Sequence, residues 1–224
     1  MGVVFSSDFQ SGNLFRVYQR EAFEYDLILQ NDINTRGNNQ WFFFSVKNVP
    51  RGHTLRFNIV NMAKRHSLFS QGMRPSVFSL VRFEKRGVGW VREGSKVVYR
   101  ASNELRREAS SHPYYCLSFE YKFTHEGDVV YFSYSIPYTC SVLNDYLSSK
   151  LSLHAGRVKV KTIGQTVGGN DVMLVQVSSP EVGQRKRSVW IMARQHPGET
   201  TASFMMEGML NFLLSESPLA QQLL

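Results

Sequence analysis

The feature that most constrains the fold is an alternation of apolar and polar residues over many short runs. In Leu117-Ser-Phe-Glu-Tyr-Lys-Phe123 every second side chain is apolar, and Ser118, Glu120 and Lys122 fall between them. A period of two is that of a β-strand with one buried and one solvated face. The alternation predicts strands at about 14–19, 24–30, 41–47, 53–61, 76–83, 88–92, 96–100, 114–123 and 128–136. So many strands require two stacked sheets, which predicts an all-β antiparallel sandwich.

The periodicity changes near Thr139, where apolar residues begin to recur at helical spacing as far as Leu151. Thr139 or Ser141 is suited to cap this helix. We therefore expect a domain boundary here, with residues 1–138 as an N-terminal β-sandwich domain and 139–224 as the first part of an α/β domain with a mixed sheet. In this second domain the sequence predicts strands at 157–167, 171–178 and 188–195, and helices at 200–215 and from Ser217-Pro218 onward.

The candidate functional site lies between the expected strand 188–195 and the helix that follows it. Pro197-Gly198 breaks the apolar run, and His196 and Glu199 flank this break. Imidazole nitrogen and carboxylate oxygen are both ligands of Zn²⁺, and catalytic zinc often binds two His, one Glu and a water. In open α/β sheets such strand–helix junctions face the ligand-binding crevice. Because His-x-x-Glu is a weak pattern when taken alone, the pair is a hypothesis for half of a zinc site.

The run Ala193-Arg-Gln-His-Pro-Gly-Glu-Thr-Thr-Ala202 resembles the metal-binding segment of the zinc carboxypeptidases, in particular the cytosolic carboxypeptidase subfamily. Other segments resemble the N-terminal domain of that subfamily. They are Ser11-Gly-Asn-Leu14, Glu24-Tyr-Asp-Leu-Ile-Leu29 with Asp32-Ile-Asn34, Gln40-Trp41-Phe42, Arg56-Phe-Asn-Ile-Val-Asn61, Gln71-Gly-Met73 with Arg74-Pro75, and Pro137-Tyr-Thr139. In their order along the chain, these segments extend the resemblance from about position 5 to the end.

The resemblance implies a zinc-dependent carboxypeptidase with His196 and Glu199 as the first two zinc ligands. Members of the subfamily act in the cytoplasm on glutamates, in side chains or C-terminal tails of tubulin and other acidic proteins. The resemblance also implies a second histidine ligand, a downstream glutamate as general base, and arginines that bind substrate carboxylates. Residues 200–224 contain no His and no Arg, so we assign no catalytic residue and expect the general base beyond residue 224.

The expected helix 200–215 is apolar nearly all round, which is typical of a buried helix. Leaving five such side chains in water would forgo roughly 7 to 15 kcal/mol, which is comparable with the stability of a whole domain. We therefore expect this chain to be a fragment of a longer enzyme, or a truncated product, and to be inactive by itself. An alternative is a non-catalytic module whose β-sandwich binds acidic tails or the catalytic domain.

Composition limits the other functions. The net charge of +8 favours a polyanionic partner, but no nucleic-acid recognition motif accompanies it, so we expect an acidic protein and no nucleic acid. No window of 18 uninterrupted apolar residues is present, so we expect no membrane span. Cys116 and Cys140 lie at or near expected strands, where cysteine is usually a small buried residue. The remaining histidines and three aspartates are best explained as surface, turn or strand-end residues: His53, His66, His112, His125, His154, Asp8, Asp26 and Asp32.

Overall fold

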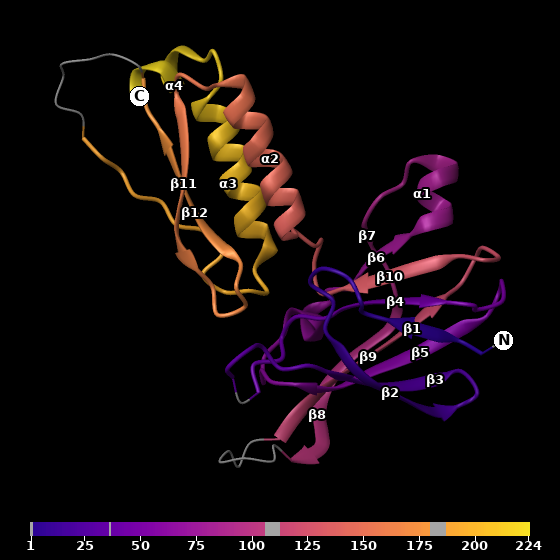
Figure 1. Ribbon diagram of the computed structural model, residues 1–224. Helices are drawn as coiled ribbons and strands as arrows, with labels where there is room; N and C mark the ends of the chain where they lie inside the picture. The colour runs from indigo at the N-terminus through magenta and orange to yellow at the C-terminus, as the bar shows by residue number, and fades with distance from the viewer. Residues whose placement is uncertain (1, 36, 106–112, 180–186) are drawn as a thin grey trace. The chain divides into compact units, whose positions relative to one another are not determined.

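The computed structural model describes residues 2–35, 37–105, 113–179 and 187–224 (Figure 1). They form two compact units, one up to Pro137 and one from Tyr138 to Leu224. In the part of the chain that the structure describes, no helix has both the length and the apolar character needed to cross a membrane.

The first unit is a sandwich of two five-stranded sheets. One sheet has the order β1-β4-β10-β6-β7, with bounds Val4–Ser6, Phe43–Lys47, Val129–Ser133, Ser76–Ser79 and Val91–Arg92. The other has the order β2-β3-β5-β9-β8, with bounds Leu14–Glu21, Glu24–Leu29, Thr54–Met62, Pro113–Lys122 and Ser95–Leu105. A short 3-10 helix spans Leu68–Gln71. The sandwich predicted from the alternation of the sequence is confirmed.

The core of this unit lies between the two sheets and is built largely from aromatic rings. Phe44 of β4 stacks on Phe132 of β10 with ring centroids 5.4 Å apart. Phe57 of β5 lies 5.3 Å from Phe119 of β9, and all four side chains are fully buried. These residues occupy the inward positions of their strands, as the period of two predicts. The core therefore accounts for these buried aromatic residues, while Phe15 and Phe23 are exposed.

One strand pair departs from the antiparallel arrangement. β3 and β5 are parallel neighbours, with Glu24 beside Arg56 and Leu27 beside Ile59. The chain leaves β3, contributes β4 to the opposite sheet and returns to the first sheet as β5. Such a crossover brings the two strands side by side in the same direction, whereas a tight hairpin would make them antiparallel.

The predicted strand 76–83 is only half correct, because β6 ends at Ser79 and helix α1 spans Leu80–Arg86. The Ser79 hydroxyl accepts a hydrogen bond from the Arg82 backbone N–H at 3.1 Å, which caps the helix. Gly87, with φ of 66°, ends it in the left-handed conformation. The apolar Val81 and Phe83 prolonged the alternation of the sequence, while the capping serine set the local structure.

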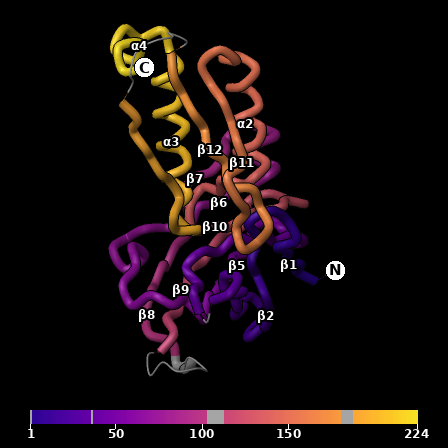
Figure 2. The backbone as a smooth tube through the Cα atoms, turned by 60° about the vertical axis from the view of Figure 1, so that its left-hand side comes forward, coloured from indigo at the N-terminus to yellow at the C-terminus, as the bar shows by residue number. Residues whose placement is uncertain are grey.

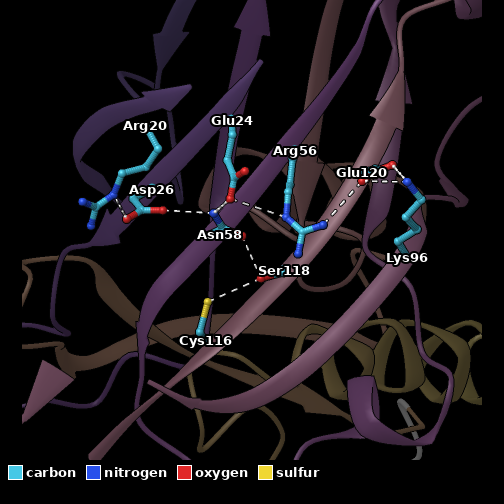
Figure 3. A network of polar contacts seen from close by, with 9 residues as sticks. All are labelled: Arg20, Glu24, Asp26, Arg56, Asn58, Lys96, Cys116, Ser118 and Glu120. Carbon is cyan, nitrogen blue, oxygen red and sulfur yellow. Dashed lines mark hydrogen bonds and ion pairs between the residues drawn. The ribbon is translucent and has the colours of Figure 1, made fainter. Parts of the chain in front are cut away.

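A polar network crosses the face of the second sheet opposite the core (Figure 3). Asp26 of β3 accepts hydrogen bonds from Arg20 and from Asn58, and Ser118 of β9 donates to Asn58 at 2.7 Å. Asp26, Asn58 and Ser118 are all buried. The prediction that Asp26 lies at a turn or strand end is wrong in position, because a strand-interior carboxylate can be buried once it is paired. Its role is structural, in agreement with the prediction.

The second unit contains two longer helices, a hairpin and a short C-terminal helix (Figure 2). Helix α2 spans Cys140–Leu153, and the Thr139 hydroxyl caps it by accepting from the Val142 backbone N–H at 3.3 Å. Strands β11 and β12 form an antiparallel hairpin with bounds Val158–Gln165 and Asp171–Val177, and α2 packs against β11. Helices α3 and α4 span Thr200–Leu213 and Pro218–Leu223. These elements match the predictions for this region.

The predicted strand 188–195 is wrong. Residues 187–194 are described but belong to no helix or strand, and Val189, Trp190 and Met192 are each more than three-quarters exposed. A strand exists only through hydrogen bonds to a neighbouring strand, and β11 and β12 pair with each other in a two-stranded sheet. For the same reason the described part of this unit contains no mixed sheet.

The burial prediction for Cys140 is also wrong, whereas helix α3 is left partly uncovered in this chain, as we expected. Helix α3 is not enclosed, since Phe204 is 40% and Met205 75% exposed. Two neighbouring helices and one hairpin do not cover an all-round apolar helix. Cys140 is the first residue of α2 and is exposed, so it is not a buried strand residue. Cys116, in contrast, is buried in β9 as predicted.

Candidate functional site

His196 and Glu199 lie at the two ends of a tight turn that leads into α3. The Glu199 backbone N–H donates to the His196 carbonyl at 3.0 Å, which closes the turn around Pro197 and Gly198. Glu199 is the N-cap residue of α3, and its side chain makes no capping hydrogen bond. Both side chains are exposed. The Glu199 carboxylate therefore does not cap the helix.

Arg194 braces this turn from within. Its Nε donates to the Pro197 carbonyl at 3.1 Å, and one of its terminal nitrogens donates to the Tyr138 carbonyl at 2.7 Å. The same terminal nitrogen lies 3.5 Å from the Ser203 hydroxyl on α3. Burial lowers the pKa of Arg194 from its ordinary value. The guanidinium thus connects the turn both to the start of the unit and to the helix that carries Glu199.

The backbone of Arg194 is unusual as well, because its φ of 56° lies in the left-handed region that non-glycine residues seldom adopt. This conformation turns the chain sharply just before His196. The sequence alone did not identify Arg194 as a positioning residue. A charged residue directly before a His-Pro-Gly-Glu turn was the available signal, but its partners lie far away in the sequence.

Helix α3 is held against α2 by two tyrosines of this unit. The Tyr138 hydroxyl donates to the Glu207 carboxylate at 2.7 Å, and the Tyr138 ring meets Phe204 edge-on with centroids 5.1 Å apart. The Tyr146 hydroxyl lies 3.1 Å from both the Glu207 carbonyl and the Asn211 side-chain oxygen. Burial and the neighbouring carboxylate raise the pKa of Tyr138 well above its usual range. Glu207 therefore has a structural partner, and these contacts fix the helix whose N-terminus holds Glu199.

The chemistry of His196 and Glu199 fits zinc, since one neutral nitrogen and one carboxylate oxygen are among its usual ligands. Within the described ranges, no three His, Cys, Asp or Glu side chains are grouped closely enough to hold a metal ion. His196 and Glu199 lie on the same exposed turn. Of the other histidines, His53 contacts the Phe23 ring and His154 caps α2, while His112 falls outside the described residues. The assignment of the two ligands stays a prediction.

Comparison with known proteins identifies the family. Residues 5–135 match the family model of the cytosolic carboxypeptidase N-terminal domain, and residues 143–224 match that of the zinc carboxypeptidases. The chain belongs to the cytosolic carboxypeptidase family. The resemblance seen in the sequence motifs is thus confirmed over both units.

Curated relatives include cytosolic carboxypeptidases 1 and 2. The chain is 38% identical to cytosolic carboxypeptidase 2 of Xenopus tropicalis over 98% of its own length and 23% of the relative's. It is 36% identical to cytosolic carboxypeptidase 2 of Homo sapiens, covering 99% of the chain and 25% of the relative. With cytosolic carboxypeptidase 1 of Homo sapiens the identity is 36%, over 98% of the chain and 19% of the relative. The chain thus spans about a quarter or less of the length of these relatives.

Solved structures of metallocarboxypeptidases share this fold. A metallo-carboxypeptidase from Burkholderia cenocepacia matches 99% of this chain and 53% of its own, with a TM-score of 0.72 and 22% identity. A putative carboxypeptidase A from Shewanella denitrificans matches 95% of this chain and 49% of its own, with a TM-score of 0.67 and 26% identity. The chain therefore shares the fold of about half of each of these bacterial metallocarboxypeptidases.

Proposed function

We propose that the complete protein is a zinc carboxypeptidase that releases glutamate from acidic proteins, from C-terminal tails or from glutamate side chains such as those of polyglutamylated tubulin. The observation that carries the proposal is the His196–Glu199 turn at the start of α3, inside the region that matches the zinc carboxypeptidase family. The protein would act in the cytoplasm, in association with the cytoskeleton where tubulin is the substrate. The cytosolic relatives support this location.

In this proposal His196 and Glu199 hold the zinc ion. When bound, zinc polarises a scissile carbonyl and lowers the pKa of its water towards about 7. Arg194 keeps the turn in shape through its bond to the Pro197 carbonyl. We expect the remaining ligand, the general base and the substrate-binding arginines in the part of the relatives that this chain does not cover.

The acidic substrate class is supported by charge. The chain carries a formal net charge of +8. A cationic protein attracts polyanions over long distances and so raises their association rate. Because simple salt screens this attraction over about 10 Å at 0.1 M, glutamate release at low substrate concentration should slow as ionic strength rises.

The ligand assignment is tested in the full-length enzyme with His196→Ala and Glu199→Ala, and with His154→Ala as a matched control. We expect both ligand variants to lose bound zinc, measured by elemental analysis, and to lose glutamate release from polyglutamylated tubulin. The control should keep both properties, because His154 lies at the far end of α2. Retained zinc and retained glutamate release in either ligand variant would refute the assignment. If the ligand variants lose zinc but the wild-type enzyme cleaves a C-terminus that is not glutamate, only the proposed substrate class is refuted.

A further inference from the structure

The outer face of the β2-β3-β5-β9-β8 sheet, which carries the polar network, is uneven in charge (Figure 3). At the end formed by the β2–β3 hairpin, Glu21 lies beside Glu24. In the same region Glu120 of β9 lies beside Arg56 of β5. Carboxylates are therefore concentrated at the hairpin end of the face. Side chains two residues apart on a strand share a face, so this face can be followed along the strands to its other end.

The other end of the face carries arginines. Arg16 of β2 pairs with Ile28 of β3, and Arg100 of β8 pairs with Cys116 of β9. The Cys116 sulfur lies 3.6 Å from the Ser118 hydroxyl, so this row lies on the same face as the network. Both arginines are exposed, and Ile28 and Cys116 are not acidic. We call Arg16, Ile28, Cys116 and Arg100 the arginine row.

The neighbouring row of the face adds little negative charge. Tyr18 pairs with Asp26, and Val98 pairs with Ser118. Tyr18 is 46% and Val98 43% exposed. The Asp26 side chain is only 11% exposed and is bound by Arg20, whose side chain is 63% exposed. The carboxylate closest to the arginine row is therefore covered by a cation, and the accessible charge at this end of the face is positive.

Arg16 is held in position by its neighbours. Its Nη1 donates to the Tyr18 hydroxyl at 3.1 Å, and its guanidinium carbon lies 5.3 Å from the centre of the Phe15 ring. The bond to Tyr18 occupies only one of the five N–H donors of a guanidinium. A side chain that is already positioned loses less rotamer freedom when a ligand binds it. Arg16 is therefore an accessible and preorganised partner for a carboxylate.

The dimensions of the face fit a short extended peptide. Neighbouring strands lie about 4.8 Å apart, so the two edge strands of this five-stranded sheet are about 19 Å apart. Six extended residues span about 20 Å. A peptide of six glutamates laid across the strands can reach from Arg16 to Arg100. Single-stranded nucleic acids depend on aromatic platforms for their bases, whereas Ile28, Val98 and Cys116 between the arginines are aliphatic or small.

We propose that the arginine row docks an acidic polypeptide, at a surface separate from the zinc turn. Arg16 and Arg100 bind carboxylates at the two edges of the sheet, and glutamate methylene groups pack over Ile28 and Val98 between them. The choice of an acidic polypeptide rests on the substrate class proposed above. Binding itself requires neither zinc nor hydrolysis. The surface would retain an acidic protein while its glutamates are removed elsewhere.

The test uses the 224-residue chain without added metal and a hexaglutamate peptide that is acetylated at its N-terminus and amidated at its C-terminus. Methyl signals are followed by NMR at about 0.15 M salt, where long-range attraction is largely screened. We expect the signals of Ile28 and Val98 to shift saturably. The signal of Val4, which is exposed on edge strand β1 of the opposite sheet, should stay in place.

Two matched double variants separate the arginine row from general charge. Arg16→Gln with Arg100→Gln should raise the dissociation constant at least about tenfold, because each loses a charge-assisted hydrogen bond to a carboxylate. Lys85→Gln with Arg86→Gln removes the same charge from α1, which follows β6 of the opposite sheet, and should change it by less than about twofold. All four side chains are exposed, so both variants should fold.

Three results would overturn the proposal. They are an equal effect of the two double variants, methyl signals of Ile28 and Val98 that do not respond to the peptide, and a hexathymidylate that shifts the same signals at the same concentration. The last result would show a general polyanion surface. If a double variant does not fold, the methyl signals of the wild-type chain decide the question.

Failure of this surface is distinguishable from failure of the proposed enzymatic function. The capped peptide has no free C-terminal carboxylate, and no metal is present. His196→Ala and Glu199→Ala should therefore bind the peptide like the wild-type chain while they lack zinc in the full-length enzyme. Peptide binding that disappears in these two variants would place it at the zinc turn and contradict a separate surface.

Discussion

The two units of this chain contain similar proportions of apolar residues and use them differently. In the sandwich, Phe44, Phe57 and Phe132 are fully buried between two sheets. In the second unit, Trp190 and Met205 lie in apolar runs of the sequence, yet each side chain is at least 75% exposed. Two sheets can cover each other, whereas one hairpin cannot cover two helices and an unpaired segment. The first unit therefore buries its own apolar side chains, whereas the second unit, which carries the candidate site, leaves many of its apolar side chains exposed.

The largest expected difference between the units is in the effect of deleting an aromatic or apolar side chain. Phe57→Ala should destabilise the sandwich by about 3 to 5 kcal/mol, because it leaves a cavity against Phe44, Phe119 and Phe132. Met205→Ala, at a side chain that is 75% exposed, should cost less than about 0.5 kcal/mol. Urea denaturation of the 224-residue chain measures both. Equal losses would mean that α3 is covered in solution.

The polar network on the outer face of the sandwich gives the next largest effect. Asn58→Ala removes a side chain that donates to Glu24 and Asp26 and accepts from Ser118. Since Asp26 and Ser118 are buried, leaving them unsatisfied should cost about 2 to 3 kcal/mol of unfolding free energy. Asn38→Ala, at an exposed asparagine of the same unit, is the control and should be nearly neutral. A neutral Asn58→Ala would show that water replaces the network.

In the second unit, we expect a substitution of Arg194 to weaken metal binding strongly and to lower stability only slightly. Arg194→Ala in the full-length enzyme removes the bonds that tie the turn to Tyr138 and Ser203. Supporting interactions of this kind are commonly worth about 10-fold to 100-fold in metal affinity, so zinc affinity should fall by at least about tenfold. Competition with a chelator measures this loss. Unchanged affinity together with a large loss of stability would assign Arg194 to the fold instead.

The smallest effect concerns alkaline pH. Burial, together with the Glu93 carboxylate, raises the pKa of Tyr121 to about 12. A raised pKa means that the folded state holds the proton more tightly than the unfolded state, so this contribution to stability is complete below about pH 10 and is lost as the pH rises towards 12. Tyr121→Phe should flatten the fall in unfolding free energy over that range. An identical alkaline slope in the variant would show that Tyr121 is not the group responsible.

How much the sequence could predict differs between the units for a physical reason. The sandwich was predictable because alternation is a local pattern and its inward face, such as Phe44 and Phe119, is buried within the same unit. The parallel pairing of β3 with β5 was not, since it depends on the route of the chain through the opposite sheet. The capping residue Ser79 was visible in the sequence but was outweighed by the apolar residues after it.

At the candidate site, residue types were predictable and supporting contacts were not. The spacing of His196 and Glu199 and the Pro-Gly pair between them identify the two residues as candidate ligands. Arg194 acts through Tyr138, 56 residues away in the chain, and no local pattern reports such a contact. The prediction of a strand at 188–195 failed because an apolar run favours a strand only when a neighbouring strand is present to pair with it. Long-range pairing thus limits prediction in both units.

The central claim is that His196 and Glu199 bind one zinc ion. Diffraction from crystals of the full-length enzyme, recorded on both sides of the zinc absorption edge, tests it most directly. The account predicts an anomalous peak at about 2.0 to 2.2 Å from a His196 ring nitrogen and a Glu199 carboxylate oxygen. A zinc peak bound by other residues, with these two side chains directed elsewhere, would contradict it.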